Sequence, residues 1–553
     1  MLGKNLSRRA FLGGAAVTAT AAVMTGLTGC VAPPGGDSSS DNGGPASSSE
    51  TASSASRWSF EIPPAPIPAG DIVETIDTDI LVVGGGVAGM SLAYFCSKNG
   101  GKVHLIEKME KPSTRSNQIG GVNTSAQKAE GIPEFPINEI ILYAKTFQGG
   151  TINADLMKQY LYNSARMWDT IADMAREDGH DPRLLARGGE GVYVVNQPYY
   201  KEYRTMAVIY DTNEDMVARF KKDSEAAGAV FHFNCPAEQI IKEGDKAIGV
   251  IAKGPDGYIQ FNAVNGIVFA TGDYAGSPEM MERYGSMATR FSDFTMYTPV
   301  GANSGEGLNM MTWIGASMQP AEHHAPMIHC LGGAYTSPNP WLRINKRGRR
   351  YENEDVPNAQ VCYGRMMQPG NVAWAIWDGN YAADSLKHSN GFGRQRANDD
   401  TEATFEENIA AGLLWKADTL DDLASQIGVP GDELKKTVER YNVLCERGDD
   451  VDYGKQTSDM NPVAVPPFYA AKIVAPLLCM VGGIEVDDQY RVLDTEGEVI
   501  ENLFAIGNCS GNYYAVDYPT IMAGQSHGRC LTAGMILGEA LAEGRLVDRI
   551  SLP

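Results

Sequence analysis

The sequence predicts an α/β fold with a parallel sheet, because two short apolar runs enclose a glycine-rich turn and a helix. Thr78–Val83 ends in an apolar, β-branched run that is typical of a buried strand. It leads into glycines at positions 84, 86 and 89, and Met90–Tyr94 then has a helical pattern. Val103–Ile106 reads as a second strand. This order of strand, turn, helix and strand is the beginning of a Rossmann-like unit.

The spacing of the three glycines predicts a dinucleotide site. Gly84 allows a tight turn, Gly86 lets a pyrophosphate approach the backbone, and Gly89 lets the helix pack closely on the strand. Glu107 ends the second strand and lies roughly 20 residues after the glycines, where an acid that binds a ribose is expected. The glycines alone would be weak evidence in a chain with 61 of them, so the prediction depends on the whole unit.

Three later segments resemble motifs of one flavoprotein family. Val268–Asp273 resembles the second glycine motif of flavoproteins with two dinucleotide-binding folds, and Asn502–Asn508 resembles their last flavin-binding strand and turn. Arg349–Glu354 is similar to the stretch "G-R-R-F-x-N-E". Together they resemble the flavoprotein subunit family of fumarate reductase and succinate dehydrogenase, which includes 3-ketosteroid dehydrogenases and anaerobic ene-reductases. The resemblance covers roughly residues 77 to 545.

The resemblance implies FAD as the cofactor and a two-dinucleotide-binding-fold FAD domain with an inserted α+β capping domain. The expected limits are residues 75–320 and 480–553 for the FAD domain and 321–479 for the capping domain. Thr114–Asn117 stands where relatives with covalent FAD have a histidine, so we expect non-covalent FAD. The predicted FAD-binding residues are Gly84, Gly86, Val87, Ala88, Gly89, Glu107, Lys108, Arg115, Ser116, Gly120, Gly121, Ala237, Ala270, Thr271, Gly272, Asp273, Gly507, Asn508, Gln525 and Ser526.

The family also implies reduction of a carbon–carbon double bond, in which one carbon accepts a hydride from the flavin and the other a proton. Fumarate reductases hold two carboxylates with arginine and histidine, and an arginine donates the proton. Here Tyr518 replaces a carboxylate-binding arginine, Leu478–Met480 lacks the clamp histidine, and Asn358 stands in place of the proton donor. We therefore expect an uncharged carbonyl rather than fumarate, with Tyr518 holding the carbonyl oxygen as in 3-ketosteroid dehydrogenases.

The sequence leaves the proton donor open. Arg365 could be a displaced equivalent of the lost arginine, His324 lies near the family's substrate-side histidine, and Asn358 could hold a water. Tyr335 and Tyr363 are further candidates. The predicted catalytic residues are Tyr518, Arg365, His324 and Asn358. Aromatic and apolar residues close to them favour a substrate that carries a ring; these are Tyr513, Tyr514, Met522, Trp341 and Met366.

The first 74 residues predict export and a lipid anchor. Ser7–Leu12 resembles a twin-arginine export signal, and Leu27–Cys30 resembles a lipobox whose cysteine is lipidated. Residues 31–74 are rich in Ser, Gly, Pro and Ala, as in a flexible linker. We therefore expect residues 1–30 to be a twin-arginine lipoprotein signal and the mature protein to be extracytoplasmic, held on the cell membrane through Cys30.

Composition narrows the possible partners. A net charge of −22 argues against nucleic-acid binding. The nine cysteines include no Cys-x-x-Cys pair, so the sequence predicts neither c-type haem nor a conventionally spaced iron–sulfur cluster, and no metal site. No second Rossmann-like unit for a nicotinamide cofactor stands out. We therefore expect a separate redox protein to supply electrons.

Three functions remain open at this stage. The first is an FAD-dependent reductase of a C=C bond conjugated to a carbonyl, of the enone or aryl-acrylate type. The second is a ketosteroid-like dehydrogenase that runs the same chemistry in the oxidative direction. The third is a non-catalytic flavin-binding lipoprotein, because Asn358 is no useful acid near neutral pH.

Overall fold

The computed structural model describes residues 58–185, 194–196, 201–296, 302–330, 334, 338–389, 391 and 393–550. The predicted signal segment, Cys30 and Tyr335 lie outside these residues. Residues 58–74, predicted as the end of the flexible linker, are instead packed on the folded part: Phe60 contacts the core, and its carbonyl accepts a hydrogen bond from Trp313 Nε1 (2.8 Å). Two short 3-10 helices, η1 (Ser59–Glu61) and η2 (Ala69–Asp71), precede the first strand.

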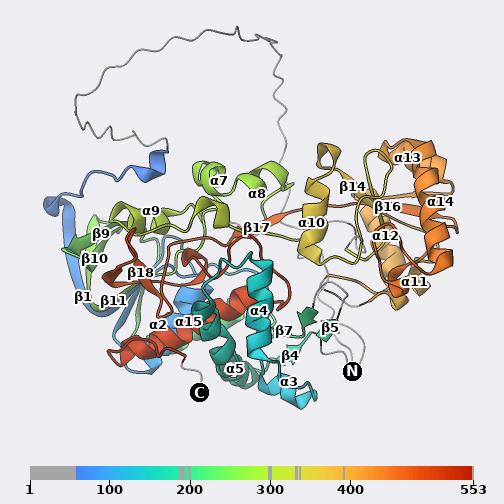
Figure 1. Ribbon diagram of the computed structural model, residues 1–553. Helices are drawn as coiled ribbons and strands as arrows, with labels where there is room; N and C mark the ends of the chain where they lie inside the picture. Colours follow the sequence, from blue (N-terminus) through green and yellow to red (C-terminus); the bar gives the residue numbers. More distant parts are fainter. Residues whose placement is uncertain are drawn as a thin grey trace, which may run out of the picture. The chain divides into compact units, whose positions relative to one another are not determined.

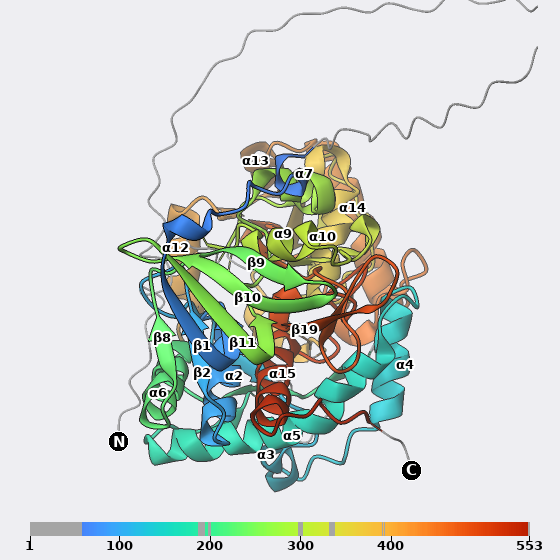
Figure 2. The same ribbon diagram turned by 90° about the vertical axis from the view of Figure 1, so that its left-hand side faces the viewer.

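The main sheet contains the predicted Rossmann-like unit. Its strands β8, β2, β1, β11 and β19 are parallel neighbours in that order, and Figure 2 shows β1, β2 and β11 side by side. Strands β9 and β10 form an antiparallel meander with β11, and β18 runs antiparallel to β19. The strands are β1 (Ile72–Val83), β2 (Val103–Ile106), β8 (Val230–His232), β9 (Ala237–Glu243), β10 (Lys246–Lys253), β11 (Tyr258–Phe269), β18 (Arg491–Leu493) and β19 (Val499–Ala505).

Two helices far apart in the sequence pack against each other beside this sheet. Helix α2 (Val87–Lys98) follows the glycine turn, and α15 (Gln525–Ala542) lies beside it (Figures 1 and 2). Their contact is close because Gly534 and Gly538 carry no side chain: a Cβ on Gly534 would lie 2.8 Å from the carbonyl oxygen of Ala88. The first turn of α15 is thereby fixed relative to the glycine turn before α2.

The remaining elements of this domain surround the sheet. They are β3 (Gln118–Gly120), α3 (Ser125–Ala129), α4 (Ile137–Phe147), α5 (Ala154–Glu177), β4 (Arg183–Leu184), β5 (Val194–Asn196), β6 (Lys201–Tyr203), β7 (Met206–Val208), α6 (Asn213–Ala226), α7 (Pro278–Tyr284), α8 (Ser286–Phe291), α9 (Glu306–Trp313), η3 (Ala321–His323) and η6 (Gly507–Cys509). No helix among the described residues is long and apolar enough to cross a membrane.

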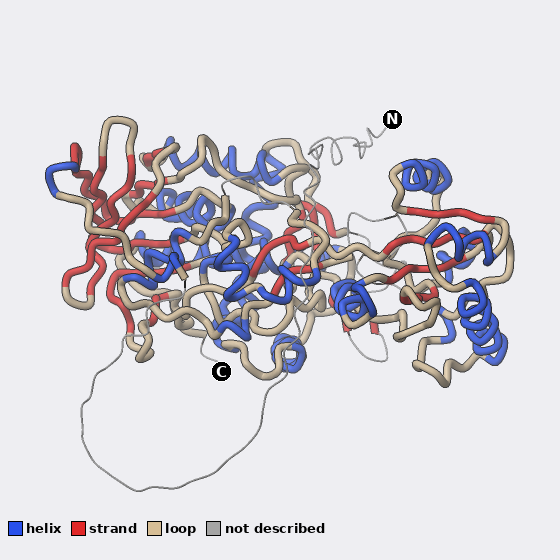
Figure 3. Tube along the Cα trace, turned by 90° about the horizontal axis from the view of Figure 1, so that it is seen from above, coloured by secondary structure: helices blue, strands red, loops and turns tan. Residues whose placement is uncertain are grey.

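Residues 342–472 form a second domain, which we call the cap. Its antiparallel sheet has the order β13-β14-β16-β15, and Figure 3 shows these strands as a group separate from the main sheet. A second hydrophobic core lies under the sheet and includes Leu342, Trp374, Leu423 and Tyr441. The elements are β13 (Leu342–Asn345), α10 (Asn358–Met366), η4 (Pro369–Asn371), β14 (Ala373–Trp377), α11 (Tyr381–Lys387), α12 (Thr401–Ala410), β15 (Leu414–Ala417), α13 (Leu420–Ile427), α14 (Gly431–Arg447), η5 (Thr457–Asp459) and β16 (Phe468–Lys472).

A two-stranded ribbon joins the domains where the chain passes between them. Strand β12 (Pro326–Ile328) precedes the cap and pairs antiparallel with β17 (Leu477–Met480), which follows it. The ribbon lies near both ends of the capping domain predicted at 321–479. The predicted limits of the capping domain remain predictions, because the described residues show no sharp domain boundary at either of them.

Candidate active site

A cavity of about 1090 Å³ opens where the parallel strands end. Val83, Ile106 and Ala270 line it, and they lie at the carboxyl ends of β1, β2 and β11. Ligands of open α/β sheets bind at this edge. The volume slightly exceeds the roughly 300–1,000 Å³ of a pocket for a drug-sized molecule.

The glycine turn fits a pyrophosphate. Gly84 has φ +108°, and a Cβ there would lie 2.7 Å from the carbonyl oxygen of Ala270, so only glycine is accommodated. A Cβ on Gly86 would have no protein atom nearer than 3.9 Å and would occupy the cavity instead. The N-terminus of α2 faces the same space with backbone N–H groups that favour phosphate. The turn is therefore a cradle for the phosphates of a dinucleotide such as FAD.

The acid that follows β2 is fixed at a position where it could bind a ribose. Glu107 lines the cavity, and its carboxylate accepts hydrogen bonds from the backbone N–H groups of Gly85 (2.5 Å) and Met109 (2.8 Å). These bonds fix the side chain at the end of the second strand, as the sequence predicts.

Most of the predicted FAD-binding residues line this cavity. They are Gly84, Gly86, Val87, Ala88, Glu107, Lys108, Arg115, Ser116, Ala237, Ala270, Thr271, Gly272, Asp273, Gly507, Asn508 and Ser526. The other four are Gly89, Gly120, Gly121 and Gln525, and they support the wall from behind. A Cβ on Gly89 would lie 2.0 Å from the carbonyl oxygen of Gly84, and a Cβ on Gly120 would lie 2.8 Å from that of Ala523. Gln525 Nε2 donates to the carbonyl oxygen of Pro519 (2.6 Å), next to Tyr518.

Tyr518 is the predicted catalytic residue that lines the cavity. Its side chain is 5% exposed, and its hydroxyl oxygen accepts a hydrogen bond from the backbone N–H of Ser526 (3.2 Å). That N–H belongs to the first turn of α15, where backbone donors have no partner within the helix. Burial raises the pKa of Tyr518 above its usual range, so the hydroxyl stays protonated. The backbone donor occupies the oxygen and leaves the O–H proton available for a second acceptor.

The other three predicted catalytic residues do not line the cavity. Arg365 is fully buried and bonded through Nη1 to Asp293 (2.6 Å) and the Ile473 carbonyl (2.8 Å). His324 uses both ring nitrogens, with Tyr274 Oη and the Gln319 carbonyl each at 2.8 Å, and burial lowers its pKa to about 4. Asn358 Oδ1 accepts from the backbone N–H of Cys330 (2.6 Å). These contacts engage the three side chains outside the cavity wall, and their catalytic roles stay predictions.

Several lining residues were not predicted from the sequence. His329 follows β12 and contacts the ring of Tyr518, with centroids 5.6 Å apart. His388, Arg394 and Arg396 reach the cavity from the cap segment after α11. Burial lowers the pKa of His388 to about 2, so this imidazole is neutral. In the sequence, Arg394 and Arg396 stand out only as a pair of arginines in a glycine-rich stretch. Their position in the cavity wall depends on the tertiary packing of the cap.

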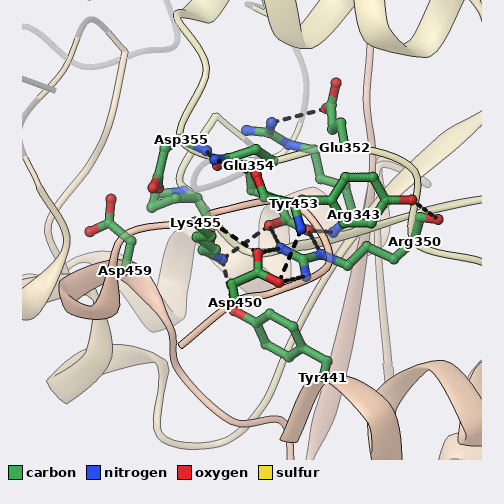
Figure 4. A network of polar contacts seen from close by, with 12 residues as sticks. Arg343, Arg350, Glu352, Glu354, Asp355, Tyr441, Asp450, Tyr453, Lys455 and Asp459 are labelled. Carbon is green, nitrogen blue, oxygen red and sulfur yellow. Dashed lines mark hydrogen bonds and ion pairs between the residues drawn. The ribbon is translucent and has the colours of Figure 1, made fainter. Parts of the chain in front are cut away.

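The cap holds a buried network of charges that includes Asp355 and Asp459 (Figure 4). Arg394 donates to Asp459 Oδ2 (3.1 Å) and to the carbonyl oxygen of Asp355 (3.1 Å). Burial, and then the Asp459 carboxylate, raise the pKa of Asp355 to about 7. For Asp459, burial raises the pKa, but the Arg394 guanidinium and the hydrogen bonds from Asp355 and Ser389 together hold it below its usual value. The pair therefore carries one proton and one negative charge at mildly acidic pH.

The Asp355→Asn variant should change how stability depends on pH. Between the unfolded-state pKa of about 3.9 and about 7, the folded protein binds the Asp355 proton more tightly than the unfolded chain does. This contribution to stability is complete at low pH and is lost as pH rises through that window. Thermal unfolding at pH 5.5 and 8 should show the variant gaining stability relative to the wild type at pH 8. Asp399→Asn, at an exposed position, is the control, and parallel profiles for wild type and Asp355→Asn would contradict the assignment.

The glycine cradle, the ribose acid and the cavity under a cap define a dinucleotide-binding flavoprotein. A model of the FAD binding domain family matches residues 79–519. The chain therefore belongs to this family, and the predicted family resemblance, fold class and FAD cofactor are confirmed.

Named relatives come from the same group of oxidoreductases. NADH:acrylate oxidoreductase of Vibrio harveyi is 25% identical over 528 residues, covering 85% of this chain but 51% of that protein, so the chain spans about half its length. Vinyl phenol reductase of Lactiplantibacillus plantarum is 24% identical, covering 84% of this chain and 96% of that protein. The chain is thus an FAD-dependent oxidoreductase of a family whose named members act on C=C or CH–CH bonds.

Solved structures show the same fold. The 3-ketosteroid-Δ4-(5α)-dehydrogenase of Rhodococcus jostii superposes with a TM-score of 0.68 at 20% identity, covering 86% of this chain and 99% of that one. The open conformation of a flavocytochrome c3 fumarate reductase gives a TM-score of 0.60 at 22% identity, covering 86% and 79%.

Proposed function

We propose that the protein reduces a C=C bond conjugated to a carbonyl, in an enone or an aryl-acrylate. The observation that carries this proposal is Tyr518, which lines the cavity and whose hydroxyl accepts a hydrogen bond from the N-terminus of α15. The name of one relative supports it, since acrylate carries a C=C bond conjugated to a carboxyl group. Vinyl phenol, in the name of another relative, carries its C=C bond on an aromatic ring and supports only reduction of a conjugated alkene.

Residues of this chain would hold the carbonyl oxygen of the substrate and deliver the proton. FAD, when bound, supplies hydride exchange with carbon. Tyr518 would donate a hydrogen bond to the substrate's carbonyl oxygen and stabilise the negative charge that develops there as the β-carbon is reduced. The α-carbon then needs a proton. We assign its delivery to His329, which lines the cavity and contacts Tyr518.

Anaerobic reoxidation of the reduced holoenzyme tests the function. The flavin would be reduced with viologen and mixed with enones, aryl-acrylates and fumarate. Fast reoxidation by enones or aryl-acrylates, and slow reoxidation by fumarate, is the expected result. Failure with every alkene would overturn the proposal, and reduction of the oxidised flavin by a saturated ketosteroid would then establish the dehydrogenase alternative. If the alkenes do not reoxidise the flavin and the saturated ketosteroid does not reduce it, the result would favour a flavin-binding protein without catalysis.

We also propose that FAD is bound without a covalent link and that a separate redox protein reduces it. Acid precipitation should release all flavin into the supernatant, and flavin that stays with the pellet would contradict non-covalent binding. For the electron donor, reduced cytochromes and flavoproteins should support turnover with an alkene. Turnover with NADH alone would remove the need for a separate partner.

The extracytoplasmic, lipid-anchored location is likewise a proposal that depends on residues 1–30. Fractionation of cells that express the full chain should find the protein with the membrane, and Cys30→Ser should move it to the soluble fraction. Membrane association that survives this substitution would contradict a lipid anchor at Cys30.

A further inference from the structure

One buried polar atom of a side chain that lines the cavity has no partner. His388 lies on the cap segment after α11, lines the cavity and is 3% exposed. Its Nε2 is buried and has no hydrogen-bond partner among the residues that the structure describes. Buried polar groups of folded proteins are nearly always paired, because an unpaired group has lost its bonds to water without replacement. A ligand in the cavity is therefore the candidate partner of Nε2.

The neighbours of His388 determine which nitrogen of its ring carries the proton. Asn339 Oδ1 accepts a hydrogen bond from the backbone N–H of Gln395 (2.7 Å), and Asn339 Nδ2 donates to the carbonyl oxygen of Gln395 (2.8 Å). Because these two bonds allow only one orientation of the amide, the atom 3.4 Å from His388 Nδ1 is a donor nitrogen. Burial lowers the pKa of His388 to about 2, so the ring is neutral. It accepts at Nδ1 and carries its proton on Nε2, which makes Nε2–H a donor.

The ring of His388 is held in place by aromatic neighbours. Trp341 contacts it edge to face with ring centroids 4.3 Å apart, and Trp377 stacks on Trp341 at 5.6 Å. The backbone is held as well, since Arg396 donates a short hydrogen bond to the carbonyl oxygen of His388. The unpaired donor is therefore fixed before any ligand binds, which lowers the entropy that binding costs.

Contacts connect the cap segment of His388 with the part of the cavity at Tyr518. Gly393, on the same segment, is so close to Asn358 that an added Cβ would clash with Asn358 Nδ2. Asn358 Oδ1 accepts a hydrogen bond from the backbone N–H of the residue after His329 (2.6 Å), and His329 contacts the ring of Tyr518. The donor at His388 therefore belongs to the part of the cavity where the proposed reaction takes place.

We propose that His388 Nε2 donates a hydrogen bond to a second oxygen of the substrate, an uncharged substituent on the ring of an aryl enone or aryl-acrylate. Tyr518 holds the carbonyl oxygen beside the double bond, so donors from two domains hold the substrate at two oxygens. Because the imidazole is neutral, it provides a directed hydrogen bond without a charge, which suits a hydroxyl or carbonyl oxygen. The inference specifies the substrate class of the proposed function and rests on it.

Binding of saturated ligands to the oxidised holoenzyme tests the inference without turnover. The probes are 4-(4-hydroxyphenyl)butan-2-one and 4-phenylbutan-2-one, which differ only in the ring hydroxyl, and their affinities are measured by titration calorimetry. We expect the hydroxylated ketone to bind about three- to tenfold more tightly, as one added hydrogen bond provides. His388→Phe should abolish this preference and leave the affinity for 4-phenylbutan-2-one within about threefold. His388→Gln, whose amide keeps a donor, should retain part of the preference.

His180→Phe is the matched control, because His180 lies outside the cavity wall and its Nδ1 is paired with Asp211. It should change neither affinity. Equal affinity of the wild type for the two ketones, or no binding of either, would overturn the inference, and so would a full preference in His388→Phe. If His388→Phe does not hold FAD, the wild-type comparison and His388→Gln decide. Failure of the proposed function would look different: the hydroxylated ketone would still bind more tightly through His388, but no alkene would reoxidise the reduced flavin.

Discussion

Replacing Tyr518 by phenylalanine should lower the rate of alkene reduction by at least about 100-fold while FAD stays bound. The substitution removes one hydroxyl from the cavity wall and leaves the buried ring in place. Removing one donor that stabilises a developing oxyanion typically costs about 10²–10³ in rate, or roughly 3–4 kcal/mol. The measurement is single-turnover reoxidation of the reduced flavin under anaerobic conditions, together with the ratio of FAD to protein.

Tyr514→Phe provides the matched control for this experiment. The ring of Tyr514 packs against that of Tyr518 with centroids 5.0 Å apart, but Tyr514 does not line the cavity. Its buried hydroxyl has no hydrogen-bond partner among the described residues, so its loss should leave the rate within about threefold. An unchanged rate in Tyr518→Phe would remove this tyrosine from the mechanism, and equal losses in both variants would show a packing effect.

Replacing Gly89 by valine should abolish FAD binding. Even a Cβ at this position would lie 2.0 Å from the carbonyl oxygen of Gly84, a backbone atom of the phosphate cradle. Helix α2 must then move away from β1, and its free N–H groups move away from the phosphates. We expect the purified variant to hold less than about one tenth of the wild-type flavin, measured by absorbance, and to unfold at a lower temperature.

Gly70→Val is the control for the added side chain. A Cβ at Gly70 would have no neighbour within 4 Å, so its flavin content should match the wild type. Full flavin content in Gly89→Val would show that α2 can shift without loss of the cradle and would contradict this account of the turn.

The sequence was sufficient to predict those features that depend on residues close together in the chain. Val103–Ile106 is a strand in both the prediction and the structure, and the glycine turn lies at the carboxyl end of β1 as expected. The strand β15 (Leu414–Ala417), which lies between the helices α12 and α13, is not indicated by the sequence. Its four residues are too few to establish an alternating pattern, and its pairing with β16 brings together residues more than 50 positions apart.

The surroundings of the predicted catalytic residues could not be predicted where their partners are distant in the sequence. Nothing near Arg365 indicates that Asp293, 72 residues earlier, occupies its guanidinium. Arg394 and Arg396 were overlooked for the same reason, since the sequence does not tell which cap segment reaches the cavity. The glycines could be interpreted because their function depends on the backbone conformation of their own turn.

The sheet of the cap lies between two hydrophobic cores. Leu342, Trp374 and Ile376 pack in the core of the cap, whereas Ala375 and Trp377 belong to the main core. Substitutions in the core of the cap should therefore act additively with distant substitutions at the glycine cradle, and those on the other face of the sheet should couple to the main domain. Tyr381 of α11 and Phe405 of α12 also belong to the main core, so both helices beside the segment that lines the cavity are tied to the flavin half of the molecule.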